Sequence, residues 1–284
     1  MNLVTVMNYD ISDKKYLAMC CNWIKQAKTH LLRRDSCFIF SKKPPSKALE
    51  SFVGEDSRFR FCVRDGLKDT RGIFFPICGT HSEGYNLTYK LYVICNLDFP
   101  FIFMDADAIM VDSIQEIEPL FHEKPAIFID HEPDIEGHTV GFPPFINSGV
   151  FMVNDPSKLL INWDKLLGHA FKCGFNCRFK ENGACISGTD QSVLKSYFDS
   201  IGYQYRHEKF GVHYNTCAER VRAFKGPLGW RAVNHEGDPV KIIHYWGPFK
   251  PWAVDCPIFK ELINDEMFCC DDVLDQTRKC EQNN

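Results

Sequence analysis

The first part of the chain alternates between short apolar runs and segments with helical periodicity. Leu3 to Met7 is an apolar, β-branched run that predicts a strand. The apolar side chains that follow have the spacing of an amphipathic helix and are Tyr16, Cys20, Trp23, Ala27 and Leu31. Next come a predicted strand at Cys37 to Phe40, a helix near Lys47 to Val53 and a strand at Phe59 to Val63. This alternation is typical of a twisted, mainly parallel α/β sheet flanked by helices.

The second half of the chain is less regular and predicts a mixed sheet. We expect strands at Ala126 to Ile129, Val150 to Val153 and Ile242 to His244, and helices at Pro156 to His169 and Asp190 to Ile201. Glycine and proline cluster at Gly137 to Pro144 and at Gly226 to Gly229, and we interpret both segments as loops at the mouth of a site. We expect one domain over residues 1–260, followed by an unassigned tail at 261–284.

Two aspartates directly follow a buried apolar run. The run from Phe99 to Met104 ends in Asp105-Ala106-Asp107. Two carboxylates so close together repel each other, and partial burial adds to the cost of keeping both ionised, so the pair favours a nearby cation. Aspartate oxygens suit Mg²⁺ or Mn²⁺, ions that complete their shell with substrate phosphate oxygens and water.

Two other interpretations fit the aspartate pair taken alone. Isolated aspartates of this spacing are often simply solvated at a strand end, so the pair has to be judged with the rest of the chain. An apolar strand followed by two such aspartates also opens the site of phosphatases that form an aspartyl-phosphate. Those enzymes place this strand first, whereas here about a hundred residues precede it, and Ala108-Ile109 replaces their hydroxyl residue and glycine.

A second apolar strand, near residue 242, also ends in a candidate metal ligand. Its last residue, His244, can offer a neutral imidazole nitrogen to a cation. Gly247 allows the backbone to approach an oxyanion, and Lys250 supplies positive charge. Lys90, on the predicted helix before the aspartate pair, is a second cation that could reach a phosphate, although its spacing fits a surface lysine equally well.

Composition and charge exclude several partners. Hydrophobic residues make up 45% of the chain and charged residues 25%, which is typical of a soluble globular protein. The formal net charge of -4 gives no general attraction to nucleic acid or anionic membranes. We find no signal peptide and no membrane span, and we interpret the 14 scattered cysteines as reduced thiols of a cytoplasmic protein. A homodimer is left open.

Four ordered segments resemble glycosyltransferase family 8, and within it the glycogenin-like enzymes. These segments run from Phe103 to Asp107, from Phe145 to Phe151, from Gly188 to Gln191, and from His244 to Trp252. Together they are far more specific than one aspartate pair. The resemblance, which covers most of the chain to about residue 252, implies a GT-A fold, a UDP-sugar donor, Mn²⁺ (or Mg²⁺), and hexose transfer with retention of configuration.

The same resemblance implies a set of site residues. The metal would be held by Asp105, Asp107 and His244. Gly247 and Lys250 would meet the diphosphate, with Lys90 near the phosphates. The remaining assignments are Asn147, Ser148, Asp190 and Gln191 around the donor sugar, the Ala106 backbone near the ribose, and Asn8 and Tyr9 near uracil. Among these, Asp190, Gln191 and Lys250 would be the catalytic residues.

The chain also departs from the family pattern. The acidic residue that some relatives carry before the Asn-Ser-Gly segment has no match, since Gly141 to Pro144 fills that stretch; Asp130 or Asp134 would have to substitute. No residue matches the tyrosine on which glycogenin builds its primer. Sugar and acceptor therefore stay open, with a glycan, a protein or a small molecule as acceptor candidates. The non-enzymatic alternative is a protein that binds sugar nucleotides without turnover.

Overall fold

In the computed structural model of the protein, the described residues are 1–7, 14–64, 89–122, 126–130, 146–156, 163–172, 178–181, 184–187, 190–202, 206–208, 211–227, 229–245, 250–252 and 256–263. The strands of the largest sheet are β1 (Asn2–Val6), β2 (Ser36–Ser41), β3 (Phe59–Val63), β4 (Phe101–Met104), β6 (Ala126–Asp130), β7 (Ile146–Val153) and β10 (Arg206–Glu208). The shorter strands are β5 (Ala108–Met110), β8 (Arg178–Glu181), β9 (Ala184–Ser187), β11 (Thr216–Cys217), β12 (Val221–Gly226), β13 (Gly229–Asn234), β14 (Pro239–Val240) and β15 (Ile242–His244). The helices with printed bounds are α1 (Lys14–His30), α2 (Lys47–Val53), η2 (Gln115–His122), α4 (Trp163–Lys172), α5 (Asp190–Ser200), α6 (Gly211–Tyr214), η3 (Ala218–Arg220) and α7 (Pro257–Ile263), and residues 89–95 are also helical.

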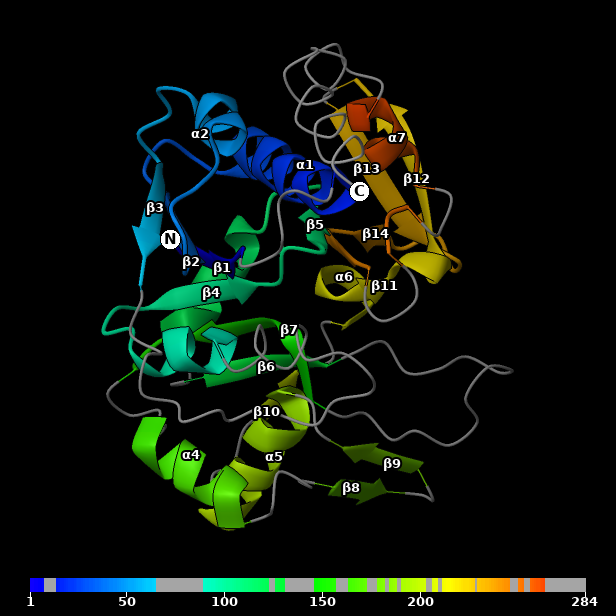
Figure 1. Cartoon of the computed structure of the whole chain (residues 1–284). Helices are drawn as coiled ribbons and strands as arrows, with labels where there is room; N and C mark the ends of the chain where they lie inside the picture. The colour runs from blue at the N-terminus through cyan, green and yellow to red at the C-terminus, as the bar shows by residue number, and fades with distance from the viewer. Residues whose placement is uncertain are drawn as a thin grey trace, which may run out of the picture.

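The largest sheet of the described chain has seven strands in the order β10-β6-β7-β4-β1-β2-β3 (Figure 1). Strands β4, β1, β2 and β3 run parallel to one another, and β10 is parallel to β6. Strand β7 is antiparallel to both β4 and β6, so the sheet is mixed. Because parallel strands need crossover connections, α1 and α2 lie between the first three strands in sequence, as the alternating pattern predicts.

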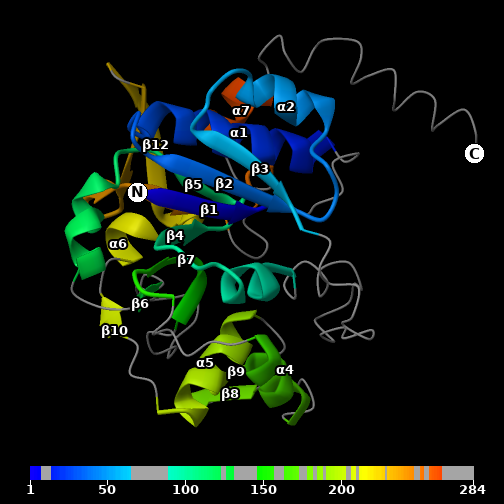
Figure 2. The same ribbon diagram turned by 90° about the vertical axis from the view of Figure 1, so that its left-hand side faces the viewer.

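The sheet separates two hydrophobic layers. Successive side chains of a strand point to opposite faces, so in β4 Ile102 and Met104 join the layer under α1, while Phe101 and Phe103 join the layer under α5. Phe103 stacks on Phe151 of β7 with ring centroids 5.0 Å apart. Figures 1 and 2 show α1 and α2 on one side of the molecule and α4 and α5 on the other. Both faces of the sheet are thus covered, which explains why β4 and the end of β7 are continuously apolar.

Smaller sheets extend the structure beyond the carboxyl end of β4. Strand β5 pairs antiparallel with β15, and β15 pairs in parallel with β11. Strands β12, β13 and β14 form an antiparallel meander that packs beside α7, and β8 and β9 form a hairpin (Figure 1). The β5–β15 pair is the important one for function, because it joins the segment after β4 to a segment near the end of the described chain.

The predicted elements of the first half agree with the structure to within one or two residues. One strand of the second half differs: β7 begins at Ile146, earlier than the predicted Val150. Helix α4 is described from Trp163, and residues 157–162 of the helix predicted to start at Pro156 lie outside the described residues. The Gly226 to Gly229 segment is the reversal of the β12–β13 hairpin, in which these two glycines face each other. Among the described helices, none combines the length and hydrophobicity needed to cross a bilayer.

Candidate functional site

The end of β4 places the two aspartates. Asp105 follows the last strand residue, and its backbone N–H donates to the Gly149 carbonyl on β7 at 2.8 Å. The chain then turns tightly, since the Ala108 N–H donates to the Asp105 carbonyl at 2.9 Å, with Ala106 buried inside the turn. Strand β5 begins at Ala108, so Asp107 lies between two strands. Both carboxylates are therefore attached to a backbone that hydrogen bonds hold in place.

Strand β15 brings His244 to the same place. It runs antiparallel to β5 with His244 opposite Ala108, and the N–H of Tyr245 donates to the Asp107 carbonyl at 2.9 Å. Two segments far apart in sequence thus meet at one end of a small sheet.

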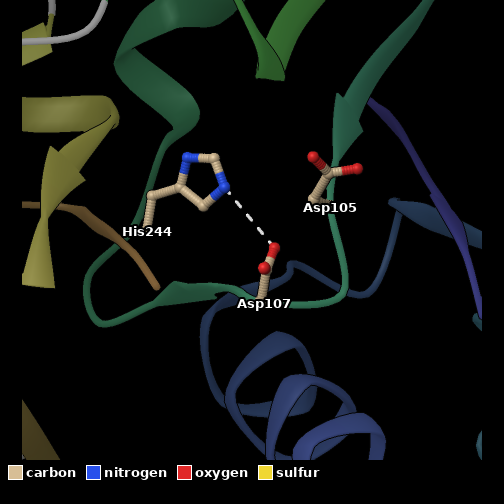
Figure 3. A group of neighbouring side chains, drawn as sticks. All are labelled: Asp105, Asp107 and His244. Carbon is tan, nitrogen blue, oxygen red and sulfur yellow. Dashed lines mark ion pairs between the residues drawn. The ribbon is translucent and has the colours of Figure 1, made fainter. Parts of the chain in front are cut away.

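The three side chains converge on a common space. One ligand atom from each of Asp105, Asp107 and His244 lies within 4.8 Å of the other two (Figure 3). His244 Nε2 is 3.4 Å from Asp107 Oδ1. The side chains of Asp107 and His244 are 8% and 4% exposed, whereas that of Asp105 is 27% exposed. Asp105 therefore forms the open side of the cluster.

The electrostatics around Asp107 stabilise its ionised form. Burial opposes ionisation, but the Lys250 ammonium outweighs it and holds the pKa of Asp107 well below its usual range. Lys250 Nζ forms an ion pair with Asp107 Oδ2. Burial likewise disfavours the charged form of Lys250, yet the Asp107 carboxylate raises the pKa of this lysine above its ordinary value. Asp107 is thus a carboxylate at neutral pH.

Asp105 belongs to a second buried cluster, centred on Lys90. Lys90 Nζ is 2.9 Å from Asp105 Oδ1 and 2.6 Å from Asp190 Oδ2, and it lies 4.8 Å from the centroid of the Phe103 ring. The Ser148 hydroxyl donates to Asp190 Oδ2 at 2.6 Å. Burial lowers the pKa of Lys90, but the two carboxylates together raise it above its ordinary value. Lys90 is therefore a buried counter-ion, which the spacing of the sequence could not distinguish from a surface lysine.

The negative charge of Asp105 is less well balanced by nearby positive charge than that of Asp107. Burial raises the pKa of Asp105 to about 6; Lys90 opposes this shift, and the charge of Asp107 reinforces it. A divalent cation at the open side would offset both the burial and the repulsion. Two carboxylates and one imidazole suit Mn²⁺ or Mg²⁺, because carboxylate oxygens are their preferred ligands and one imidazole is compatible with Mn²⁺. The residues present therefore fit a divalent cation.

Gly149 permits the close approach of β7 to His244. A Cβ at this position would lie 2.1 Å from His244 Cε1, far inside the van der Waals distance.

Gly149→Ala is expected to lower the free energy of unfolding by about 1–3 kcal/mol, because the buried ring has to move. Urea denaturation measures this change. In the control Gly168→Ala on α4, nothing lies within 4 Å of the added Cβ, and helix propensity predicts stabilisation by about 0.5–1 kcal/mol. Equal stability changes in the two variants would contradict the argument.

Some of the other predicted site residues lie near the Lys90 cluster, and others lie outside the described residues. Asn147 and Ser148 lie on β7, and Gln191 follows Asp190 on α5, so these segments surround the Lys90 cluster. Asn8, Tyr9, Gly247, Asp134 and Gly141 to Pro144 lie outside the described residues, and Asp130 ends β6. One residue that we did not predict is Asn215, whose side chain contacts His244 Nδ1 at 2.8 Å.

Comparison with solved structures finds the same architecture in several glycosyltransferases. The chain resembles the glycosyltransferase GlyE of Streptococcus pneumoniae with a TM-score of 0.54 and 15% identity, over 99% of this chain and 63% of GlyE. It resembles the galactosyltransferase LgtC, solved with donor and acceptor sugar analogs, with a TM-score of 0.52 and 16% identity, over 92% and 95% of the two chains. The chain has a GT-A fold.

A third structure with this fold is the bifunctional glycosyltransferase WbbM, with a TM-score of 0.56 and 13% identity, over 95% of this chain and 51% of WbbM. The chain thus spans about three fifths of GlyE, half of WbbM and nearly all of LgtC. No protein-family model matches the sequence, and no curated protein matches it.

Proposed function

We propose that this protein is a glycosyltransferase that moves a hexose from a UDP-sugar to an acceptor hydroxyl, with Mn²⁺ as the preferred ion and with retention of configuration. We further propose that it belongs to the glycogenin-like part of family 8, on the strength of the four sequence segments. At the level of identity found here, the solved structures support the fold, and the site supports the activity.

The observation that carries the proposal is the convergence of Asp105, Asp107 and His244 at the carboxyl end of β4. In an open α/β sheet, ligands bind beyond the carboxyl ends of the strands. Two carboxylates and an imidazole at that position could hold a cation that grips a diphosphate. The phosphatase alternative is less well supported, since its nucleophilic aspartate belongs on the first strand and Asp105 follows β4.

A bound divalent cation would supply positive charge to the diphosphate as it leaves. In the proposal, Asp105, Asp107 and His244 hold that ion. Lys250, whose ammonium already lies beside Asp107, adds a second positive charge on the same side, and Gly247 offers its backbone to the diphosphate. Leaving-group stabilisation is thus the main catalytic contribution that we assign to these residues.

The donor sugar is proposed to lie near the Lys90 cluster. Asn147, Ser148, Asp190 and Gln191 would bind its hydroxyls, and Asp190 would also stabilise positive charge that develops on the sugar ring. Lys90 neutralises Asp105 and Asp190 in this arrangement, so we assign it to the charge balance of the site as well as to the phosphates. The Ala106 backbone is proposed to meet the ribose, and Asn8 and Tyr9 the base.

Retention is explained most simply by attack on the same face of the sugar. The bond between the anomeric carbon and the β-phosphate oxygen breaks, and the acceptor oxygen forms the new bond from the side of the leaving group. The acceptor proton passes to the departing phosphate oxygen, which removes the need for a separate base. A glycosyl adduct trapped on Asp190 would instead show a two-step route through a covalent intermediate.

The proposal is tested by incubating the protein with Mn²⁺ and a panel of UDP-sugars and measuring released UDP. We expect release with one or a few donors, and its loss on addition of a chelator. Mass analysis of the products then identifies the acceptor. Tight binding of UDP-sugars without release would instead favour the non-enzymatic protein, and hydrolysis of phosphomonoesters alone would favour the phosphatase.

A further inference from the structure

The two ring nitrogens of His244 face different partners. Nε2 is directed to Asp107 and the common space of the three candidate ligands, 3.4 Å from Asp107 Oδ1 (Figure 3). Nδ1 lies 2.8 Å from the side-chain oxygen Oδ1 of Asn215. An amide oxygen only accepts hydrogen bonds, so this contact requires a proton on Nδ1. On a neutral ring, Nε2 then carries the lone pair that a cation needs.

Asn215 is held firmly in this position. It lies between α6 and β11, and β11 pairs with β15 so that Cys217 is opposite His244. On the other side, the Tyr214 hydroxyl donates to Glu116 Oε1 at 2.6 Å, and the Lys241 N–H donates to the His213 carbonyl at 2.6 Å. The backbone on both sides of Asn215 is therefore tied to neighbouring elements. A partner fixed in this way can orient the imidazole ring rather than follow it.

Water is a poor substitute for this contact. Asn215 is fully buried and His244 is only 3% exposed. If the amide oxygen were removed, the Nδ1 proton would have little access to another acceptor. The amide is also uncharged, so it accepts this hydrogen bond without adding a further negative charge to a cluster that already contains Asp105, Asp107 and Asp190.

We infer that Asn215 is a positioning residue of the candidate metal site: it fixes His244 in the tautomer protonated at Nδ1 and directs Nε2 to the cation. The cation-binding part of this inference rests on the proposed function, whereas the tautomer is a property of the protein alone. Asn215 acts through His244 and has no assigned contact with the sugar or the diphosphate.

The tautomer is measured by ¹⁵N NMR on metal-free protein labelled at histidine, with the ring neutral. The chain has ten histidines, and the His244 signals are assigned by their loss in His244→Gln. We expect a protonated Nδ1 and an unprotonated Nε2 in the wild type. A ring protonated at Nε2 instead would overturn the inference, whatever the protein does with sugars.

Mn²⁺ affinity, measured by electron paramagnetic resonance, tests the consequence. Asn215→Leu keeps the number and branching of the side-chain heavy atoms but has no acceptor, and we expect binding to weaken about 10- to 100-fold, as for other partners of metal-binding histidines. Asn215→Asp keeps an acceptor oxygen and should recover binding to within about threefold of the wild type. The neighbouring Thr216→Ser keeps the buried hydroxyl and removes one methyl group, so it is the control for packing and should leave affinity within about twofold.

Far-ultraviolet circular dichroism and thermal unfolding identify variants that do not fold. If Asn215→Leu is unfolded, the comparison passes to Asn215→Ser, which is expected to fold and to bind Mn²⁺ more weakly. Wild-type Mn²⁺ affinity in a folded Asn215→Leu or Asn215→Ser variant would refute the inference. The inference would also fail if Asn215→Asp folded but bound Mn²⁺ as weakly as a variant without the acceptor. If the wild type binds no Mn²⁺, the metal site of the proposed function fails, and the NMR result still decides the role of Asn215.

Discussion

Asp107→Asn is expected to lower metal-dependent UDP release by about a thousandfold, equivalent to ~4 kcal/mol of transition-state stabilisation. The substitution keeps the shape of the side chain but removes its negative charge, which the Lys250 ammonium stabilises. The cation loses a strong ligand, and Lys250 loses the carboxylate that fixes its position. Initial rates of UDP release at saturating Mn²⁺ and donor measure the effect.

The matched control for this prediction is Asp98→Asn. Asp98 is exposed and lies just before β4, so its substitution should leave the rate within about twofold. Mn²⁺ affinity measured on the same samples should fall in Asp107→Asn alone. If Asp107→Asn kept more than about a tenth of the wild-type rate, Asp107 would not be a ligand of an ion required for turnover.

Lys90→Met is expected to lower the free energy of unfolding by about 3–5 kcal/mol, the range found when one partner of a buried ion pair is removed. Lys90 is 3% exposed and contacts Asp105 and Asp190, so its loss leaves one half-buried and one buried carboxylate without their counter-ion. Urea denaturation of the metal-free protein measures the change. Exposed Lys47, substituted by methionine, should shift the same free energy by at most about 0.5 kcal/mol.

A second substitution tests the cause of that loss. In the Lys90→Met background, Asp190→Asn removes one of the unpaired charges and should restore part of the stability. The two substitutions should therefore be non-additive by about 1–3 kcal/mol in a double-mutant cycle. Additive effects would show that Lys90 stabilises the fold through another contact, such as that of its ammonium with the Phe103 ring, and not through the carboxylates.

The sequence predicts the first half of the fold well because local and tertiary signals agree there. The apolar runs of β1, β2 and β3 are bounded by polar turns, and in α1 the predicted apolar positions Cys20, Trp23 and Ala27 are buried. Ser46 at the start of α2 accepts a hydrogen bond from the Leu49 N–H at 3.2 Å, the contact expected of a helix cap. The sequence predicts too short a strand for β7, because Asn147, Ser148 and Gly149 break its apolar pattern.

The sequence predicts part of the candidate site, because the apolar runs of β4 and β15 end in carboxylate and imidazole side chains that are recognisable metal ligands. Asp105, Asp107 and His244 were singled out because they follow apolar runs, and the structure brings them together. Their partners were harder to find. Lys90 is typical of a helix surface until the fold places it between two carboxylates, and Asn215 has no local signal at all. Its contact with His244 depends on the pairing of β11 with β15, which only the tertiary structure determines.

The short pairing of β5 with β15 has a consequence for how the chain folds. Roughly 140 residues separate Asp107 from His244, so their meeting closes a long loop, and such contacts form late because of their entropic cost. A cation held by both segments would bind only when they are together. It would therefore stabilise the fully folded chain relative to states in which β15 has not yet paired with β5. Manganese should then slow unfolding, even for a chain that has met no sugar nucleotide.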